Sequence, residues 1–244
     1  KLIEENLVDT KKDGSFWLDQ NYFNYSTDFT MINTKFENLF GKKRREPEKD
    51  KIEQFHMDIA ASIQSFTEEI MLKLSRSIRD EFGIENLCLA GGVALNCVAN
   101  GKILKEKIFK NIWIQPAAGD AGGSLGAALQ YWYHELENSR DAKMKFYDDM
   151  KGSYLGPEFS NTEIKKELTE SGAVFEELND QDLIDHTAKS LSNGDAIGWF
   201  QGRMEFGPRA LGGRSILGDP RSETMQKNLN LKVKYRESFR PFAP

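Results

Sequence analysis

The sequence is poor in cysteine and in histidine. It contains two cysteines, Cys88 and Cys97, and three histidines, His56, His134 and His186, in 244 residues. Two cysteines cannot build a disulfide framework, and three scattered histidines cannot form a histidine-based metal site from this chain alone. We expect both cysteines to be buried as small apolar side chains. The low cysteine content favours a reducing, cytoplasmic location.

Long apolar runs and several well-known motifs are also missing. No run approaches the ~20 residues that span a bilayer, and no secretory signal follows Lys1. HEXXH, paired CxxC, GxSxG, the full P-loop and GxGxxG are all absent, as are solenoid repeats and low-complexity tracts. The chain starts without methionine and stops at RPFAP, so we expect a fragment cut at both ends.

The patterns that are present predict an α/β protein. Apolar residues recur at helical spacing from Ile52 to Ile78, which predicts a long helix ending near Gly83. Two strand–loop–helix units follow, with strands at 84–90 and 111–116 and helices at 93–104 and from 124 to about 137. Strands that alternate with helices in this way favour a layered α/β architecture.

The second half of the chain repeats this mixture after a polar stretch at 141–152, where we place a domain boundary. It predicts helices at 161–171 and 180–193 and strands at 173–178 and 196–200. The aromatic-rich start, residues 1–40, is expected to pack, with an edge strand or hairpin at 21–29. The mixed-charge run at 41–51 is expected to be a solvated loop.

The segment 201–221, QGRMEFGPRALGGRSILGDPR, is the most informative stretch. Its glycines and prolines argue for specific turns rather than a regular helix or strand. Arginines on such a backbone offer planar donors to phosphate or carboxylate. Residues 202–244 hold nine lysines and arginines against four acidic residues, although the whole chain carries a net charge of −5. This concentration predicts an anion site, while pairing with nearby acidic residues remains the alternative.

Two small-residue loops are candidate nucleotide contacts. Gly91 and Gly92 follow a strand and open a helix, so a phosphate could approach the backbone there; a tight packing turn is the alternative. Asn96 could touch a ribose or cap the helix. Asp120 stands among small residues at the end of the next strand, where it could hold a divalent metal or cap the helix that follows.

Four stretches together resemble the O-carbamoyltransferase family of nodulation-factor and antibiotic biosynthesis. They are LAGGVALNCVANGKI, IQPAAGDAGGSLGAAL, GRMEFGPRALGGRSIL with GDPR, and VKYRESFRPFAP. The resemblance implies a mixed α/β and α+β chain. Residues 1–145 would be the second half of an actin/sugar-kinase/heat-shock-type ATPase domain of the threonylcarbamoyl-transferase kind. Residues 146–244 would begin a carbamoyl-adenylate-forming (YrdC-like) domain and stop before its end.

The resemblance also implies a reaction and a set of site residues. Carbamoyl phosphate and ATP would give a carbamoyl-adenylate, whose carbamoyl group passes to a hydroxyl of a sugar or antibiotic. Asp120 would bind a divalent metal, Fe or Mg, with other ligands outside this chain, because the family's HxxxH pair is absent here. The remaining implied residues are Gly91, Gly92 and Asn96 at the nucleotide loop, and Arg203, Glu205, Arg209, Arg214, Ser215, Lys234, Arg236 and Arg240 at the carbamoyl-phosphate and ATP pocket, with Glu205, Arg209 and Arg214 as the catalytic set.

Two other functions are considered. A relative of tRNA-modification enzymes or sugar kinases would share the ATPase half, but GRMEFGPRALG fits neither kinase pattern. A nucleic-acid-binding module could use the basic carboxyl-terminal region, yet the net charge of −5 disfavours it. A homo-oligomer is left open, and no short motif names the acceptor.

Overall fold

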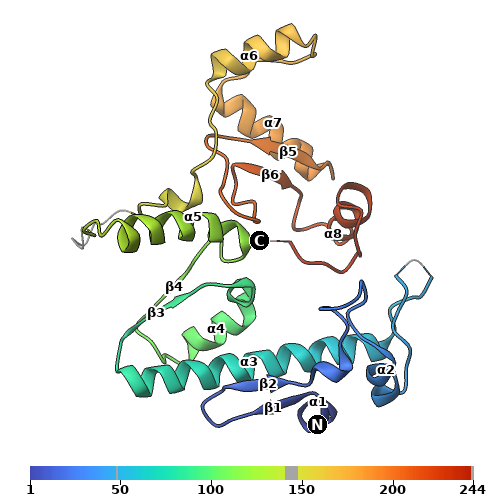
Figure 1. Ribbon diagram of the computed structural model, residues 1–244. Coiled ribbons are helices and arrows are strands. Elements are labelled where there is room, and N and C mark those ends of the chain that lie inside the picture. Colours follow the sequence, from blue (N-terminus) through green and yellow to red (C-terminus); the bar gives the residue numbers. More distant parts are fainter. Residues whose placement is uncertain (48, 141–147, 243–244) are drawn as a thin grey trace. The chain divides into compact units, whose positions relative to one another are not determined.

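The computed structural model describes residues 1–47, 49–140 and 148–242, and the chain divides into two compact units, Lys1–Gln115 and Pro116–Pro244 (Figure 1). The domain boundary predicted at 145/146 lies within residues 141–147, which are outside the described residues, so it stays a prediction. Each unit mixes helices with a small number of strands, which confirms the predicted mixed α/β class.

Helix α3 (Gln54–Phe82) organises the first unit and confirms the predicted long helix. Glu53 and His56 form a capping box at its start, in which the His56 imidazole accepts a hydrogen bond from the Glu53 backbone N–H at 3.0 Å. Gly83 ends the helix in the left-handed conformation (φ 64°). His56 therefore contributes to the cap of this helix.

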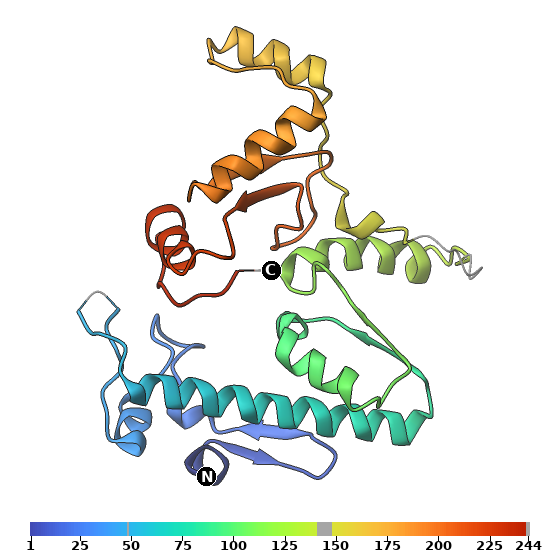
Figure 2. The same cartoon turned by 180° about the vertical axis from the view of Figure 1, so that it is seen from behind.

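A hairpin and a strand–helix–strand unit lie along α3. Strands β1 (Val8–Thr10) and β2 (Phe16–Leu18) pair antiparallel, and their turn touches α3, because a Cβ at Gly14 would lie 2.6 Å from the Leu74 nitrogen. Strands β3 (Asn86–Leu89) and β4 (Asn111–Ile114) pair in parallel, joined through α4 (Cys97–Lys105). Figures 1 and 2 show the hairpin and α4 along α3. The apolar core of this unit contains Leu87, Ile103 and Phe109, with Met71, Leu72 and Leu89 packed against it.

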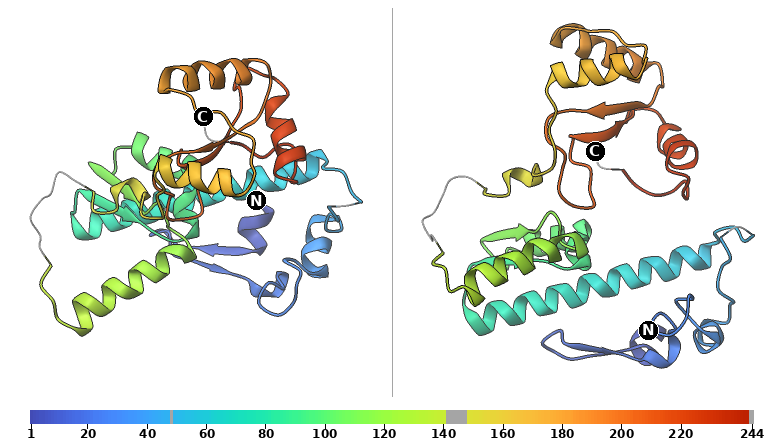
Figure 3. Two further views of the ribbon diagram at one scale, coloured as in Figure 1. Left: turned by 90° about the horizontal axis from the view of Figure 1, so that it is seen from above. Right: turned by 45° about the horizontal axis from the view of Figure 1, so that its top comes forward.

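The second unit begins with α5 (Asp120–Gln130) and continues with α6 (Asn161–Glu170) and α7 (Asp180–Ser192). Ser160 and Asn179 cap α6 and α7, and both helices match their predictions closely. Strands β5 (Ile197–Phe200) and β6 (Arg214–Leu217) pair antiparallel, and α6, α7 and β5 lie close together (Figure 3). Residues of these three elements line one groove of mixed apolar and polar character. This two-stranded sheet carries the arginine-rich segment between its strands.

Shorter elements complete the chain. They are α1 (Leu2–Asn6), η1 (Gln20–Tyr22), α2 (Thr34–Phe40), η2 (Gly92–Leu95), η3 (Tyr131–Glu135), η4 (Lys151–Ser153), α8 (Met225–Asn228) and η5 (Leu229–Val233). No helix in the described part of the chain is long and apolar enough to cross a membrane.

Several local predictions were wrong for identifiable reasons. Residues 173–178 form no strand, because no neighbouring strand pairs with them and Val174 is fully exposed. The helix predicted at 93–104 is interrupted at Asn96, which adopts an extended backbone and caps α4. The helix expected from residue 124 starts at Asp120, with Gly119 as its N-cap. Cys88 and Cys97 are exposed free thiols rather than buried side chains.

Candidate anion-binding loop

The arginine-rich segment is a loop closed by a strand pair. It leaves β5 after Phe200 and returns at Arg214, and these two residues face each other in the register of the sheet. The sequence predicted turns throughout, so the strand at Arg214–Leu217 is a correction. Trp199 and Phe200 are residue types that favour strands, and they lie in β5, which pairs with β6. The loop that joins β5 to β6 is therefore fixed at both ends.

A buried carboxylate holds the inside of this loop. Glu205 is 6% exposed, and its Oε1 accepts hydrogen bonds from the backbone N–H groups of Leu211 (2.7 Å), Gly213 (2.6 Å) and Arg214 (3.2 Å). Burial raises the pKa of Glu205, but these backbone hydrogen bonds outweigh burial, and the pKa lies below its usual value. The carboxylate is ionised at neutral pH and organises the loop; its predicted catalytic role stays a prediction.

Arg214 ties the loop to its surroundings through backbone carbonyls. Its Nη1 donates to the carbonyls of Gln201 (3.2 Å) and Gly213 (2.7 Å), and its Nη2 donates to Pro157 (3.3 Å). Both terminal nitrogens also reach the carbonyl of Gly202 at 3.1 Å. The guanidinium stacks on the ring of Phe200, with Cζ 3.3 Å from the ring centre. Most of its donor capacity is therefore used within the protein.

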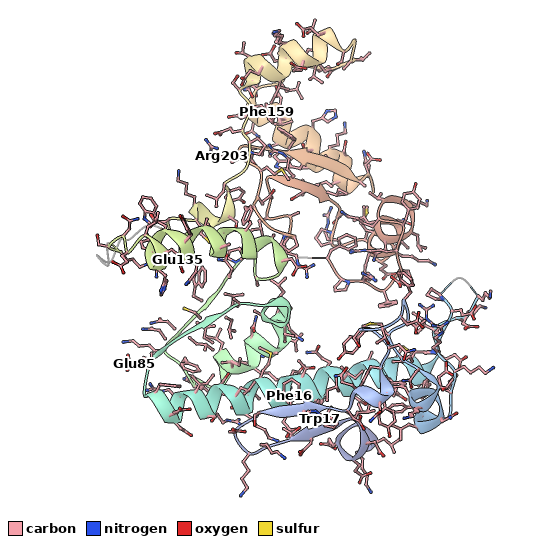
Figure 4. All side chains as sticks on the ribbon, in the orientation of Figure 1. Phe16, Trp17, Glu85, Glu135, Phe159 and Arg203 are labelled. Carbon is pink, nitrogen blue, oxygen red and sulfur yellow. The ribbon has the colours of Figure 1, made fainter. Side chains whose placement is uncertain are left out.

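Arg203 and Tyr154 fasten the loop to the segment that precedes α6. Arg203 donates from Nη1 to the Gly156 carbonyl (3.1 Å) and pairs with Glu158 at 3.3 Å. The Tyr154 hydroxyl donates to the Leu211 carbonyl. Figure 4 labels Arg203 beside this segment, with Phe159 further along it. A Cβ at Gly213 would lie 2.7 Å from the Arg203 carbonyl oxygen, so this close packing requires glycine.

Arg209 differs from the other three arginines of the loop. Its side chain is exposed, and in the part of the chain that the structure describes it makes no hydrogen bond or ion pair. Ser215, which the sequence grouped with it, has its hydroxyl occupied as the acceptor of the Gly212 N–H (3.1 Å). Among the described residues, the Arg209 guanidinium therefore has no protein acceptor, and its donors suit an external anion.

Arg221 is bound to Asp219 two residues earlier. Its Nε donates to Oδ1 at 2.9 Å and its Nη2 to Oδ2 at 2.7 Å, while its backbone N–H donates to Oδ1 at 2.9 Å. The side-chain and backbone hydrogen bonds from Arg221 lower the pKa of Asp219 to about 2. For Arg221 the structure therefore agrees with the alternative expectation from the sequence, in which an arginine of the segment pairs with a nearby acidic residue.

The Asp219 turn gives an acid-dependence prediction. Because its pKa lies below the ordinary value of roughly 3.9, ionised Asp219 stabilises the fold above pH ~4, and that contribution is lost as the pH falls towards 2. We expect Asp219→Asn to lower the thermal midpoint at pH 7, with the difference from wild type shrinking between pH 4 and pH 2.5. Circular dichroism measures both, with exposed Asp195→Asn as control. A difference that stays constant with pH would refute this account.

The carboxyl-terminal cations are arranged around a buried asparagine. Asn230 is fully buried, and its Nδ2 donates to the carbonyls of Ser238 (3.2 Å) and Arg240 (2.8 Å). Its Oδ1 accepts from Arg236 Nε at 2.6 Å, and Arg240 pairs with Glu237 at 2.8 Å. The Lys234 side chain is exposed and makes no hydrogen bond or ion pair with described residues, although its backbone N–H donates to the Leu229 carbonyl at 2.9 Å. Of these three cations, Arg236 and Arg240 thus have protein partners among the described residues, and the Lys234 ammonium has none.

The arginine loop contacts the segment before Asp120. A Cβ at Gly207 would lie 3.2 Å from the Cβ of Ala117 and 3.4 Å from the Pro116 carbonyl oxygen, and Ala117 is fully buried. Asp120 itself is exposed at the first position of α5, where its charge suits the helix N-terminus.

Asp120 alone does not make a metal site. No cluster of three histidine, cysteine or acidic side chains suited to a metal ion occurs among residues 1–47, 49–140 and 148–242. Mg²⁺ and Fe²⁺ need several ligands, so the residues described here do not fit a complete centre.

The glycine loop of the first unit has room for a ligand. Gly91 adopts φ 97° and ψ 162°, a conformation open essentially to glycine alone, and a Cβ at Gly91 or Gly92 would meet nothing within 4 Å. The backbone is thus open at both glycines, and the nucleotide contact of Gly91 and Gly92 stays a prediction. Asn96 caps α4 by accepting the Ala99 N–H (3.2 Å) and exchanges two hydrogen bonds with Gln64 of α3. Its nucleotide contact remains a prediction.

Sequence reasoning missed the residues that shape these loops. These residues contact backbone groups or side chains that are distant in the sequence, and they are Tyr154, Phe200, Asn230 and Gln64. Only the Asp219 turn carried a readable signal, since an aspartate before proline commonly binds the backbone two residues later.

Comparison with known families matches most of the chain. The family described as Carbamoyltransferase N-terminus matches residues 1–129, and the family described as Carbamoyltransferase C-terminus matches residues 188–244. The first of these covers more than half of the chain.

Similar proteins come from several bacteria. An uncharacterized protein of Synechocystis sp. is 59% identical over 245 residues, which is 100% of this chain and 39% of that protein. Nodulation protein NolO of Bradyrhizobium diazoefficiens is 44% identical over 192 residues, 78% of this chain and 34% of its own length. Nodulation protein U of Rhizobium tropici is 32% identical over 190 residues, 77% and 30% respectively. The chain thus spans less than half the length of each relative.

Proposed function

This chain belongs to the carbamoyltransferase family, and we propose that it supplies the anion-binding and nucleotide-binding loops of an ATP-dependent O-carbamoyltransferase. Carbamoyl phosphate and ATP, with one water, would yield carbamoyl-adenylate, pyrophosphate and phosphate. The carbamoyl group would then pass to a hydroxyl of a small sugar or antibiotic-like acceptor, releasing AMP.

The observation that carries this proposal is the contrast among the loop arginines. Arg203, Arg214 and Arg221 donate hydrogen bonds to protein acceptors, whereas the Arg209 side chain has no partner among the described residues and lies on a loop that Glu205 holds in place. Because the loop backbone is held, only the Arg209 side chain has to become ordered when its guanidinium binds the charged oxygens of a phosphoryl group. We assign Arg209 to the phosphate of carbamoyl phosphate.

The other predicted residues take supporting roles in this proposal. Arg203, Arg214 and Ser215 would fix the loop around the bound phosphate, with Glu205 as its clamp. Lys234 would supply a second free cation, held near the positions of Arg236 and Arg240 by the tail around Asn230. In the first unit, Gly91 and Gly92 would accept a nucleotide phosphate, with Asn96 fixing their loop to α3. A divalent metal would need Asp120 together with ligands from outside this chain.

The test uses the natural protein that carries this chain. We expect carbonyl-labelled carbamoyl phosphate to place its label in an acceptor, with AMP and pyrophosphate formed in equal amounts. Pyrophosphate–ATP exchange that requires carbamoyl phosphate would mark the adenylate step. ADP as the sole nucleotide product would instead indicate kinase chemistry, and label in tRNA would indicate a tRNA-modifying enzyme. Either of those results would overturn the proposal.

A further inference from the structure

A cavity in the first unit lies away from the glycine loop and is lined by residues of α2, of the first turns of α3 and of the turn that precedes α2. Figure 1 shows where α2 and α3 lie. Its volume is about 510 Å³, within the range that holds small organic ligands. The Phe23–Ile32 bridge closes the turn on one side. The apolar side chains that line the cavity are Phe29, Met31, Ile32, Phe36, Phe55 and Ile59.

The charged side chains that line this cavity all carry the same sign. Lys42, Lys43, Arg44 and Arg45 follow directly after Gly41, whose left-handed conformation (φ 68°) ends α2 and turns the chain. No carboxylate lines the cavity within the described residues. An apolar cavity with a wholly cationic wall is complementary to a ligand that joins an apolar body to a negative charge.

Two of these four cations are already engaged within the protein. Lys42 pairs with Glu53 and lies 5.3 Å from the Phe55 ring centre, and Arg45 donates to the Asp50 carbonyl at 3.1 Å. The side chains of Lys43 and Arg44 are exposed and make no hydrogen bond or ion pair with any described residue. The Arg44 backbone N–H donates to Glu37 at 3.0 Å, which fixes where its side chain begins.

The apolar part of the cavity has a packed floor and an open rim. Phe36 packs against Phe23 and Phe40, with ring centres 6.0 and 4.6 Å apart, so the floor is well supported. Phe29 is fully exposed and Met31 is 70% exposed on the rim. Two large apolar side chains left in water beside two unpaired cations mark a surface that a ligand would cover.

We propose that this cavity binds a small aromatic organic anion, with its ring between Phe29 and Phe55 and its phosphate or similar group at Lys43 and Arg44. The volume suits one aryl or nucleoside phosphate. Carbamoyl transfer as proposed above uses none of these residues, so this site is independent of the arginine loop. The ring would gain the apolar contact that the rim lacks, and the anion would gain two charge-assisted hydrogen-bond donors.

The test measures binding of 1-naphthyl phosphate to the 244-residue chain by fluorescence. We expect saturable binding at least tenfold tighter than that of either 1-naphthol or inorganic phosphate, because the two halves of the site act together. The variant Lys43→Glu/Arg44→Glu should weaken binding at least tenfold, and Phe29→Ala should weaken it several-fold. All three residues are exposed, and circular dichroism checks that each variant is folded.

The matched control is Lys12→Glu/Lys35→Glu, which changes the net charge equally at two exposed lysines outside the cavity. Its affinity for 1-naphthyl phosphate should stay within twofold of wild type. Equal weakening by both double variants, or affinity no better than that of phosphate alone, would overturn the proposal. Tighter binding of a twelve-nucleotide oligo(dT), lost in Lys43→Glu/Arg44→Glu, would replace it with a single-stranded nucleic-acid site.

Discussion

Glu205→Ala is expected to lower the free energy of unfolding of the second unit by about 3–5 kcal/mol, because it removes a buried ionised acceptor from three backbone N–H groups. In the natural protein the same change should reduce carbamoyl-phosphate-dependent turnover by about ten- to a hundredfold, since the loop that carries Arg209 would no longer be held. Urea denaturation of the chain and steady-state kinetics of the natural protein measure the two effects.

Glu205→Gln serves as the graded control for this prediction. The amide keeps a carbonyl oxygen in the same place but loses the charge, so we expect a smaller loss, about half as large. If Glu205→Ala unfolds at the same urea concentration as wild type, the carboxylate does not clamp the loop. If instead the alanine variant is unstable while the glutamine variant equals wild type, shape rather than charge fixes the loop.

Gly122→Ala is expected to destabilise α5 strongly, whereas Gly126→Ala in the same helix should stabilise it. A Cβ at Gly122 would overlap the carbonyl oxygen of Ala117, a backbone atom that cannot move without shifting the segment against Gly207. We expect a loss of about 2–4 kcal/mol from this overlap. A Cβ at Gly126 meets nothing within 4 Å, so alanine should add roughly 0.5–1 kcal/mol through helix propensity.

The pair is measured by thermal unfolding of the two variants and wild type under identical conditions. Opposite shifts in the midpoint are the expected result. Stabilisation by Gly122→Ala would show that the Pro116–Ala118 segment does not pack onto α5 as described, and would also remove the contact between this segment and the arginine loop.

Local physical chemistry predicted the elements whose formation depends on local sequence. The apolar stripe and Gly83 predicted α3, and Ser160 and Asn179 at the helix starts agree with α6 and α7. The strand predicted at 173–178 failed because a strand needs a partner, and the sequence cannot show that none is nearby. The continuous helix predicted at 93–104 failed for a related reason, because Asn96, where it is interrupted, bonds to Gln64 on another helix.

The sequence predicted which residue types make up the candidate site, but it did not predict how their side chains are placed. Arginines among glycines indicated an anion-binding loop, yet nothing in the sequence separates Arg209 from Arg214. The difference comes from the carbonyls of Pro157, Gln201 and Gly213, which accept hydrogen bonds from Arg214 only once the chain has folded. Glu205 was predicted as a site residue, and its clamp on three backbone N–H groups became visible only in the structure.

The most direct test of the account is binding of carbamoyl phosphate to the natural protein and its Arg209→Ala variant, measured by isothermal titration calorimetry, with exposed Lys227→Ala as control. Loss of one charged hydrogen-bond donor should reduce the binding free energy by about 1.5–3 kcal/mol, which raises the dissociation constant roughly ten- to hundredfold. We predict that loss for Arg209→Ala, with unchanged thermal stability, and less than a twofold change for Lys227→Ala. Equal affinity of wild type and Arg209→Ala would contradict the assignment of this loop to the carbamoyl donor.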